Sequence, residues 1–176
     1  MLKYVDTQVV FAEVPDEITL AISISGCPCH CKGCHSSYLA EDIGKELEWH
    51  GCVGKLKKSK GLSKLIEENK GITCVCFMGG DNDPRMINEL ASKIKRHCQL
   101  APEYWGNLKV AWYSGRQELS PEIDLWNFDY IKLGPYKEEC GPLDKRTTNQ
   151  RFYKVVHTSA GKSKLYDITH KFWKHD

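Results

Sequence analysis

Alternating hydrophobic and polar positions mark the first clear element of the chain, at residues 18–24. Ile18, Leu20, Ile22 and Ile24 share one face of an extended chain, and smaller or polar residues occupy the other. This period of two predicts a β-strand. Apolar runs rich in strand-forming residues at 72–78, 108–113, 129–133 and 152–156 predict further strands, the first of them buried.

Two other segments have helical spacing. Residues 61–69 place Leu62, Leu65 and Ile66 on one face, and Gly71 is suited to end a helix there. Pro84 opens a longer helix whose apolar face comprises Met86, Ile87, Leu90, Ile94 and Cys98. Residues 38–47 could hold a short helix, and 119–126 a connector or helix.

Strands that alternate with helices favour an α/β domain with a mostly parallel sheet. A closed eight-fold barrel needs about 250 residues, and this chain has 176. The sequence therefore predicts an incomplete (partial) β/α barrel of about five or six mostly parallel strands.

Composition narrows the class of protein. No apolar run approaches the roughly 18 residues of a membrane span, so we expect a soluble chain with no membrane partner. The net charge of +2 gives no reason to expect nucleic acid, and a short solvated loop accounts for the basic segment 55–60. Nine cysteines and no signal peptide favour a reduced, cytoplasmic protein over a disulfide framework.

A cysteine-rich loop follows the first strand. Cys27, Cys31 and Cys34 form a C-x3-C-x2-C pattern. A cubane iron–sulfur cluster takes four thiolates, so three leave one iron open to a ligand. Cys29, inside the loop, is not expected to be a ligand.

A zinc site is the simpler alternative. The four cysteines of this loop, with His30 and His35, could form a zinc knuckle. The chain would then be a non-enzymatic zinc or iron–sulfur binding module.

Several polar or glycine-rich turns follow predicted strands. They are the cysteine loop, Gly79-Gly80-Asp81, Tyr113-Ser114-Gly115 and the strand-end residue Lys132. Parallel α/β folds place active sites at the C-terminal ends of their strands, so these turns should meet in one pocket. Two glycines let a ligand approach the backbone, and the adjacent acid suits an ammonium group.

The cysteine loop resembles the signature of the radical S-adenosylmethionine family. The resemblance implies that Cys27, Cys31 and Cys34 hold a [4Fe–4S] cluster, whose open iron binds S-adenosylmethionine. The family pattern prefers an aromatic residue where Gly33 stands, and His35 could supply the planar surface instead. Gly79-Gly80-Asp81 resembles the Gly-Gly-acid element that binds the methionyl amino group, although the proline that often follows is absent.

Two more motifs are similar to one branch of that family, the activating proteins of anaerobic ribonucleoside-triphosphate reductase. They are Tyr113-Ser114-Gly115-Arg116 and Asn149-Gln150-Arg151. The resemblance spans residues 1–156 and leaves 157–176 as a C-terminal tail. It implies a partial barrel of radical S-adenosylmethionine type, with Tyr113 and Ser114 at the cofactor. Lys132 could meet a carboxylate or ribose of the cofactor, or be a strand-end lysine that reaches solvent.

The resemblance also implies a reaction. One electron from a flavodoxin-like donor cleaves S-adenosylmethionine, and the resulting radical takes hydrogen from a backbone glycine of the catalytic subunit of the reductase. A sheet too short to close would leave one side open to such a protein substrate. The alternative within the family is an enzyme that acts on a small molecule, of deazapurine synthase type.

Overall fold

The computed structural model describes residues 1–50, 61–159 and 161–173. Its strands are β1 (Lys3–Val10), β2 (Thr19–Ile24), β3 (Lys45–Glu46), β4 (Trp49–His50), β5 (Cys74–Met78), β6 (Lys109–Tyr113), β7 (Tyr130–Leu133), β8 (Arg151–His157) and β9 (Ser163–Asp167). The α-helices are α1 (Gly61–Glu68), α2 (Pro84–Leu100) and α3 (Pro102–Trp105), and 3₁₀ helices cover Ser37–Ala40, Leu125–Asn127 and Thr169–Phe172. The basic segment 55–60 lies outside the described residues.

The predicted strands and both clearly periodic helices are present, with small shifts at their ends. The segment at 38–47 instead forms the 3₁₀ helix Ser37–Ala40 and the short strand β3. Residues 119–126 form a connector that leads into the 3₁₀ helix Leu125–Asn127. The segment 157–176, expected as a tail, contributes β9 to the sheet.

The predicted fold class is wrong. Eight of the nine described strands, all but β4, form one mixed sheet in the order β3-β1-β2-β5-β6-β7-β8-β9. Four of the seven pairings between these strands are antiparallel, and only β2, β5, β6 and β7 run parallel. Three α-helices accompany the described strands, so the domain is a mixed open sheet and not a partial, mostly parallel β/α barrel.

The error arises from strands at the two sides of the sheet. In β1, Lys3, Asp6 and Gln8 interrupt the apolar pattern, and no residue of the strand is fully buried. A strand that is not buried on either face carries little hydrophobic signal, so periodicity overlooks it. At the other side, β8 and β9 form an antiparallel hairpin, and β9 has no buried residue either.

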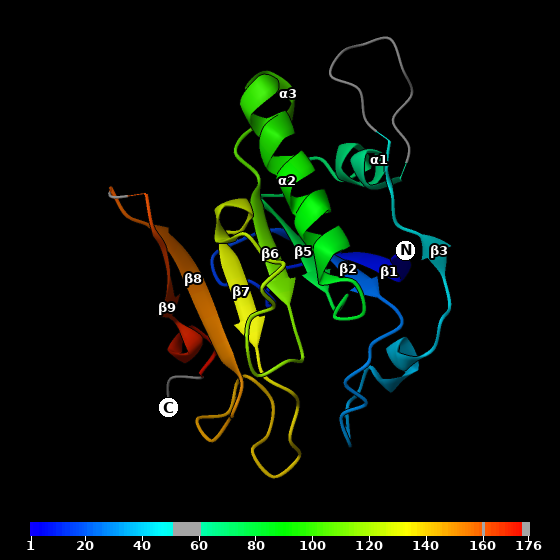
Figure 1. Ribbon diagram of the computed structural model, residues 1–176, viewed down its shortest axis with the longest axis vertical. Coiled ribbons are helices and arrows are strands. Elements are labelled where there is room, and N and C mark those ends of the chain that lie inside the picture. The colour runs from blue at the N-terminus through cyan, green and yellow to red at the C-terminus, as the bar shows by residue number, and fades with distance from the viewer. Residues whose placement is uncertain (51–60, 160, 174–176) are drawn as a thin grey trace.

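Helices α1 and α2 cover one face of the sheet (Figure 1). The core on this face includes Leu20, Ile22, Ile24, Val75, Phe77, Val110, Trp112 and Ile131 from the strands, with Leu62, Ile87, Leu90 and Ile94 from the helices. Asp83 caps α2, because its side chain accepts a hydrogen bond from the Met86 amide at 3.1 Å. Full burial of a Leu or Ile side chain contributes roughly 1.5–3 kcal/mol, so this face supplies most of the stability that holds the parallel strands.

The opposite face has a smaller apolar cluster. Its buried members are Val14, Cys74, Cys76, Ala111, Tyr130, Phe152 and Ile168. The β1–β2 connection lies over this cluster, where the Tyr113 hydroxyl donates to the backbone carbonyl of Glu13. Cys74, Cys76 and Cys98 are buried in the two cores.

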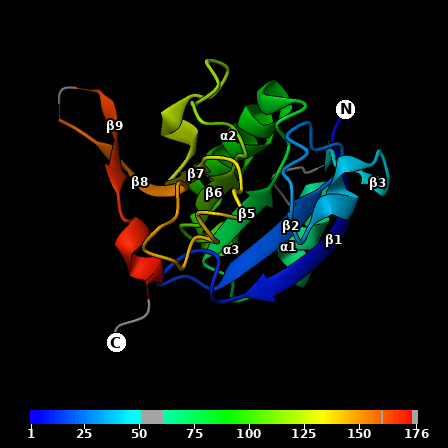
Figure 2. The same ribbon diagram turned by 90° about the horizontal axis from the view of Figure 1, so that it is seen from below.

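The C-terminal ends of the parallel strands point to one edge of the sheet. In Figure 1, strands β5, β6 and β7 point downward to this edge, where the cysteine loop and the connection between β7 and β8 also lie. Viewed from that edge in Figure 2, the sheet is curved, with β1 and β9 at opposite sides. The fold thus gathers the predicted functional turns at one open edge.

Candidate functional site at the strand ends

The cysteine loop begins directly after β2 and is fixed at its start by backbone hydrogen bonds. The Gly26 amide donates to the carbonyl of Glu41 at 3.0 Å, and the Cys27 amide donates to that of Leu39 at 2.9 Å. Gly26 has φ = +74°, and a Cβ there would lie 2.7 Å from the Asn82 side-chain nitrogen. Glycine is therefore required where the loop meets the turn after β5.

The three motif cysteines are partly exposed and carry free thiols. A turn joins the last two, with the Cys34 amide donating to the carbonyl of Cys31 at 3.2 Å. In the described part of the chain, no three His, Cys, Asp or Glu side chains are placed to share one metal ion.

Cys29 has a different environment from its neighbours. Its thiol donates to Asp81 Oδ2 at 3.7 Å, and a Cβ at Gly115 would lie 2.7 Å from its sulfur. Burial, together with the Asp81 carboxylate, raises the pKa of the Cys29 thiol to about 12. Metal ligation requires a thiolate, so this environment favours a protonated residue that joins the loop to the sheet.

The predicted Gly-Gly-Asp turn is tightly constrained. Gly79 and Gly80 have φ = +104° and +92°, in the region that favours glycine. A Cβ on Gly80 would lie 2.5 Å from Ile87 Cδ1. The Gly79 carbonyl accepts a hydrogen bond from Trp112 Nε1 at 2.8 Å, so the turn is fixed against the core.

Asp81 connects the turns after β5 and β6. The residue is 1% exposed, and its carboxylate accepts from Ser114 Oγ at 2.6 Å and from the Gly115 amide at 2.7 Å. The Arg116 guanidinium donates to the Asp81 carbonyl at 3.0 Å. Ser114 and Asp81 are thus in direct contact, as their predicted shared pocket requires.

Tyr113 points away from these turns. Its hydroxyl donates to the Glu13 carbonyl, and its ring contacts Phe152 with the centroids 5.8 Å apart. Burial raises the pKa of the Tyr113 hydroxyl well above its usual value. The hydroxyl is used within the fold, which leaves the backbone of the turn as its contribution to the strand-end edge.

Lys132 is a buried cation at the same edge. It is 7% exposed, and its ammonium group donates to the carbonyls of Gly134 at 2.6 Å and Ser114 at 3.3 Å. Burial lowers the pKa of Lys132 to about 8, while the nearby Asp81 carboxylate and loop thiols favour its charged form. The possibility that this lysine simply reaches solvent is therefore wrong.

The Asn-Gln-Arg element lies against the turn after β7. Asn149 Nδ2 donates to the Pro135 carbonyl at 2.9 Å, and a Cβ on Gly134 would lie 3.2 Å from Gln150 Cα. Asn149 Oδ1 is buried and has no hydrogen-bond partner among the described residues. The Asn-Gln-Arg motif alone did not indicate that the Asn149 Oδ1 acceptor would be unpaired among the described residues.

An aromatic residue does lie against Gly33, but it comes from another loop. Gly33 is exposed with φ = +75°, and a Cβ there would lie 3.4 Å from the Tyr136 ring. His35, predicted to supply a planar surface, is exposed. Sequence reasoning missed Tyr136, because the contact joins segments about a hundred residues apart and no spacing pattern records it.

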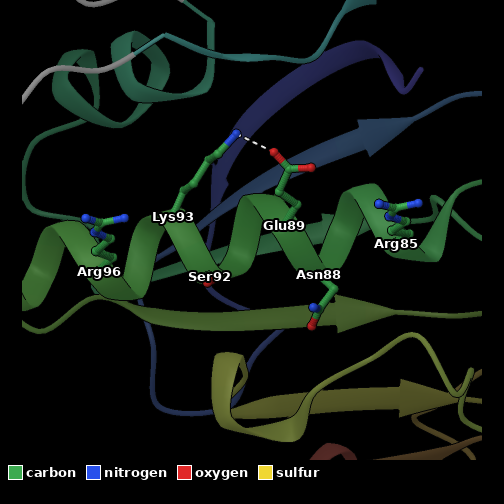
Figure 3. Close-up of a pocket in the computed structure, with 6 residues that line it drawn as sticks. All are labelled: Arg85, Asn88, Glu89, Ser92, Lys93 and Arg96. Carbon is green, nitrogen blue, oxygen red and sulfur yellow. Dashed lines mark hydrogen bonds and ion pairs between the residues drawn. The ribbon is translucent and has the colours of Figure 1, made fainter.

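Two hollows among the described residues lie away from the cysteine loop. One, of about 410 Å³, runs along the outer surface of α2 and is lined by Arg85, Asn88, Glu89, Ser92, Lys93 and Arg96 (Figure 3). Its polar groups lie along the helix, with Lys93 and Glu89 paired at 2.6 Å. The other, of about 590 Å³, lies near the N-terminal ends of β6 and β7.

Comparison of the chain with protein-family models, curated proteins and solved structures gave no match. Within the described residues, no helix is both long and apolar enough to cross a membrane.

Proposed function

We propose that this chain is an iron–sulfur activase that uses S-adenosylmethionine to generate a glycyl radical on anaerobic ribonucleoside-triphosphate reductase. The observation that carries the proposal is the meeting of four turns at one sheet edge. Cys29 of the cysteine loop contacts Asp81, Asp81 contacts Ser114, and the Ser114 carbonyl accepts a hydrogen bond from Lys132.

The donor set fits a [4Fe–4S] cluster held by Cys27, Cys31 and Cys34. A cubane spreads three thiolates over three different irons, whereas one zinc ion requires its ligands to converge. The choice of the cluster over the zinc knuckle rests on the spacing of Cys27, Cys31 and Cys34. The buried ammonium of Lys132, whose charge the Cys31 and Cys34 thiolates favour, would offset part of the negative charge that the thiolates bring.

The adjoining turns offer complementary groups for the amino acid end of S-adenosylmethionine. The turn after β5 brings Gly79 and Gly80 to this edge, where Gly79 is partly buried and Gly80 is buried. The Asp81 carboxylate already accepts from Ser114, Gly115 and Cys29 and lies 3.8 Å from Arg116 Nε, so a cofactor ammonium would displace one of these partners. Lys132 uses two of its three N–H donors within the fold, and the third is free for a carboxylate or ribose oxygen.

The adenosyl end of S-adenosylmethionine is proposed to lie among polar and planar groups of the turn after β6 and of the cysteine loop. The Ser114 side chain orders the turn after β6, and the Tyr113 side chain anchors that turn to the sheet face that carries the smaller apolar cluster. The Tyr136 ring, which a Cβ on Gly33 would approach to 3.4 Å, supplies a planar surface beside the loop, and His35 is nearby in sequence.

When both groups are bound, they supply a one-electron reductive cleavage of S-adenosylmethionine that yields methionine and a carbon radical able to take hydrogen from a glycine Cα. The chain's residues hold the cofactor at the strand-end edge. Because β3 and β9 form the two edges of the described sheet, that sheet is open. An open site favours a macromolecular substrate whose own loop covers the reacting atoms and excludes water.

Metal analysis of protein purified without oxygen tests the proposal. We expect about four irons and four sulfides per chain, and cleavage of S-adenosylmethionine when a flavodoxin-like donor or dithionite supplies electrons. Stoichiometric zinc without iron would contradict the cluster. A small metabolite consumed in step with S-adenosylmethionine would instead identify the deazapurine-synthase type of enzyme.

A further inference from the structure

The second hollow has the composition of a binding site. It is lined by Pro15, Asp16, Glu17, Lys109, Tyr130, Lys154, Val156, Tyr166, Ile168 and Lys171. Its volume of about 590 Å³ falls within the roughly 300–1,000 Å³ of small-molecule sites. The proposed cluster chemistry uses none of these residues.

A buried carboxylate organises the floor of this hollow. Glu17 is 6% exposed and accepts hydrogen bonds from Tyr130 Oη at 3.0 Å and Thr73 Oγ1 at 2.7 Å. It also pairs with the Lys109 ammonium, and this hydrogen bond raises the pKa of Lys109. Lys109 and Tyr130 are therefore held in place, and two further N–H donors of Lys109 stay available.

One wall of this hollow combines a lysine ammonium group with an exposed tyrosine ring. Tyr130, Lys154 and Tyr166 lie side by side on three neighbouring strands, because Lys154 is paired in register with both tyrosines. Directly paired residues point to the same face of a sheet. Tyr166 is 66% exposed, so its ring is free to stack, and Val156 and Ile168 add apolar surface beside it.

The charges of the lining leave an excess cation. Lys109 pairs with Glu17, and Lys171 pairs with Asp16 at the rim. Lys154 forms no ion pair or hydrogen bond through its side chain within the described part of the chain. Three lysines against two carboxylates give the lining a formal charge of +1, which favours an anion.

We propose that this hollow binds a nucleotide, with phosphate at Lys154 and Lys109 and the base stacked on Tyr166. Phosphate requires ammonium donors, and an exposed aromatic ring is a stacking platform for any base. A simple inorganic anion would not use the tyrosine wall. The site is separate from the cysteine loop, so the proposal does not depend on the cluster.

Calorimetric titration of the full-length chain, without S-adenosylmethionine, tests this site. ATP, GTP, CTP and UTP are titrated separately, with inorganic triphosphate and the matching nucleoside for comparison. We expect at least one nucleotide to bind more tightly than either of its parts. Lys154→Gln and Tyr166→Ala should each weaken binding about tenfold, the scale of one charged hydrogen bond or one stacked base.

Two matched variants control for lost charge and lost aromatic surface. Lys162→Gln removes an exposed lysine of the β8–β9 turn, and Tyr104→Ala removes a tyrosine of α3 that is 67% exposed. Neither should change nucleotide affinity, and thermal melting should show all four variants folded. The proposal fails if no nucleotide binds, if inorganic triphosphate binds as tightly, or if Lys154→Gln and Tyr166→Ala leave affinity unchanged. Competition by S-adenosylmethionine would also overturn it, by locating the nucleotide at the strand-end site.

Discussion

Replacing Asp81 with alanine should destabilise the fold even when no cofactor is bound. The carboxylate is buried and accepts two short hydrogen bonds, from Ser114 Oγ at 2.6 Å and the Gly115 amide at 2.7 Å. A hydrogen bond to a charged group contributes about 1.5–3 kcal/mol, and donors left unsatisfied add to the loss. Asp81→Ala should therefore lower the free energy of unfolding by about 3–5 kcal/mol.

A double-mutant cycle with Ser114→Ala isolates the contact between the two side chains. Ser114→Ala alone should cost about 1.5–3 kcal/mol. Because both variants remove the same hydrogen bond, the double variant should be less destabilised than the sum of the two by at least about 1 kcal/mol. Asp81→Asn, which keeps the Oδ1 acceptor but not the charge, should fall between wild type and Asp81→Ala.

Urea unfolding of the full-length chain, followed by tryptophan fluorescence, measures these free energies. Asp144→Ala is the control, since Asp144 is exposed and its loss should stay within about 0.5 kcal/mol. If Asp81→Ala is no more destabilising than Asp144→Ala, or if the cycle shows no coupling, Asp81 does not join the turns as described.

The remaining predictions concern cofactor binding, backbone strain and pH. Replacing any of the three motif cysteines with alanine should abolish the brown iron–sulfur absorbance and all cleavage of S-adenosylmethionine, whereas Cys29→Ala should keep both; a Cys29→Ala protein without iron would show that the ligands are misassigned. Asp81→Ala should weaken S-adenosylmethionine binding by about 1–3 kcal/mol in calorimetry with iron content unchanged, and unaltered affinity would leave Asp81 with a structural role alone. Gly80→Ala should destabilise by about 1–3 kcal/mol in urea, because its φ is +92° and the added Cβ meets Ile87 at 2.5 Å; a neutral effect would contradict the tight turn. Burial lowers the pKa of Lys132 from 10.5 to about 8, so between these pH values the unfolded chain binds more protons than the folded one. The free energy of unfolding, relative to that of Lys132→Met, should therefore rise by up to about 3 kcal/mol from pH 8 to 10.5. If this difference does not change with pH, Lys132 is not a buried cation.

The centre of the sheet could be read from the sequence because its strands are buried on both faces. Residues 72–78 and 108–113 are nearly continuous apolar runs, and their strands β5 and β6 contribute Phe77 and Trp112 to the core. The helix opened by Pro84 was equally clear, since Pro84 suits a first helical position and the apolar face has helical spacing. The sides of the sheet were less clear, because strands without a buried residue, such as β1 and β9, have no strong hydrophobic period.

The candidate site could also be predicted only in part, because some of its features are local in the sequence and others depend on contacts between distant segments. The cysteine spacing and the strand-end glycines are local features, and the parallel centre of the sheet brings their turns to one edge. The hydrogen bonds from Ser114 to Asp81 and from Lys132 to the Ser114 carbonyl depend on the pairing of neighbouring strands, which the sequence does not encode in any short pattern. The row Tyr130, Lys154 and Tyr166 is likewise a product of strand pairing. The contact of Tyr136 with Gly33 joins two loops that are far apart in the sequence.

Electron paramagnetic resonance of the partner reductase tests the proposed activase function most directly. The iron-loaded chain is mixed without oxygen with S-adenosylmethionine, dithionite and the catalytic subunit of the anaerobic reductase. We predict an oxygen-sensitive glycyl radical on the reductase, which disappears when its radical glycine is changed to alanine or when this chain lacks Cys27, Cys31 and Cys34. Cleavage of S-adenosylmethionine without any radical on the reductase would contradict the proposed function.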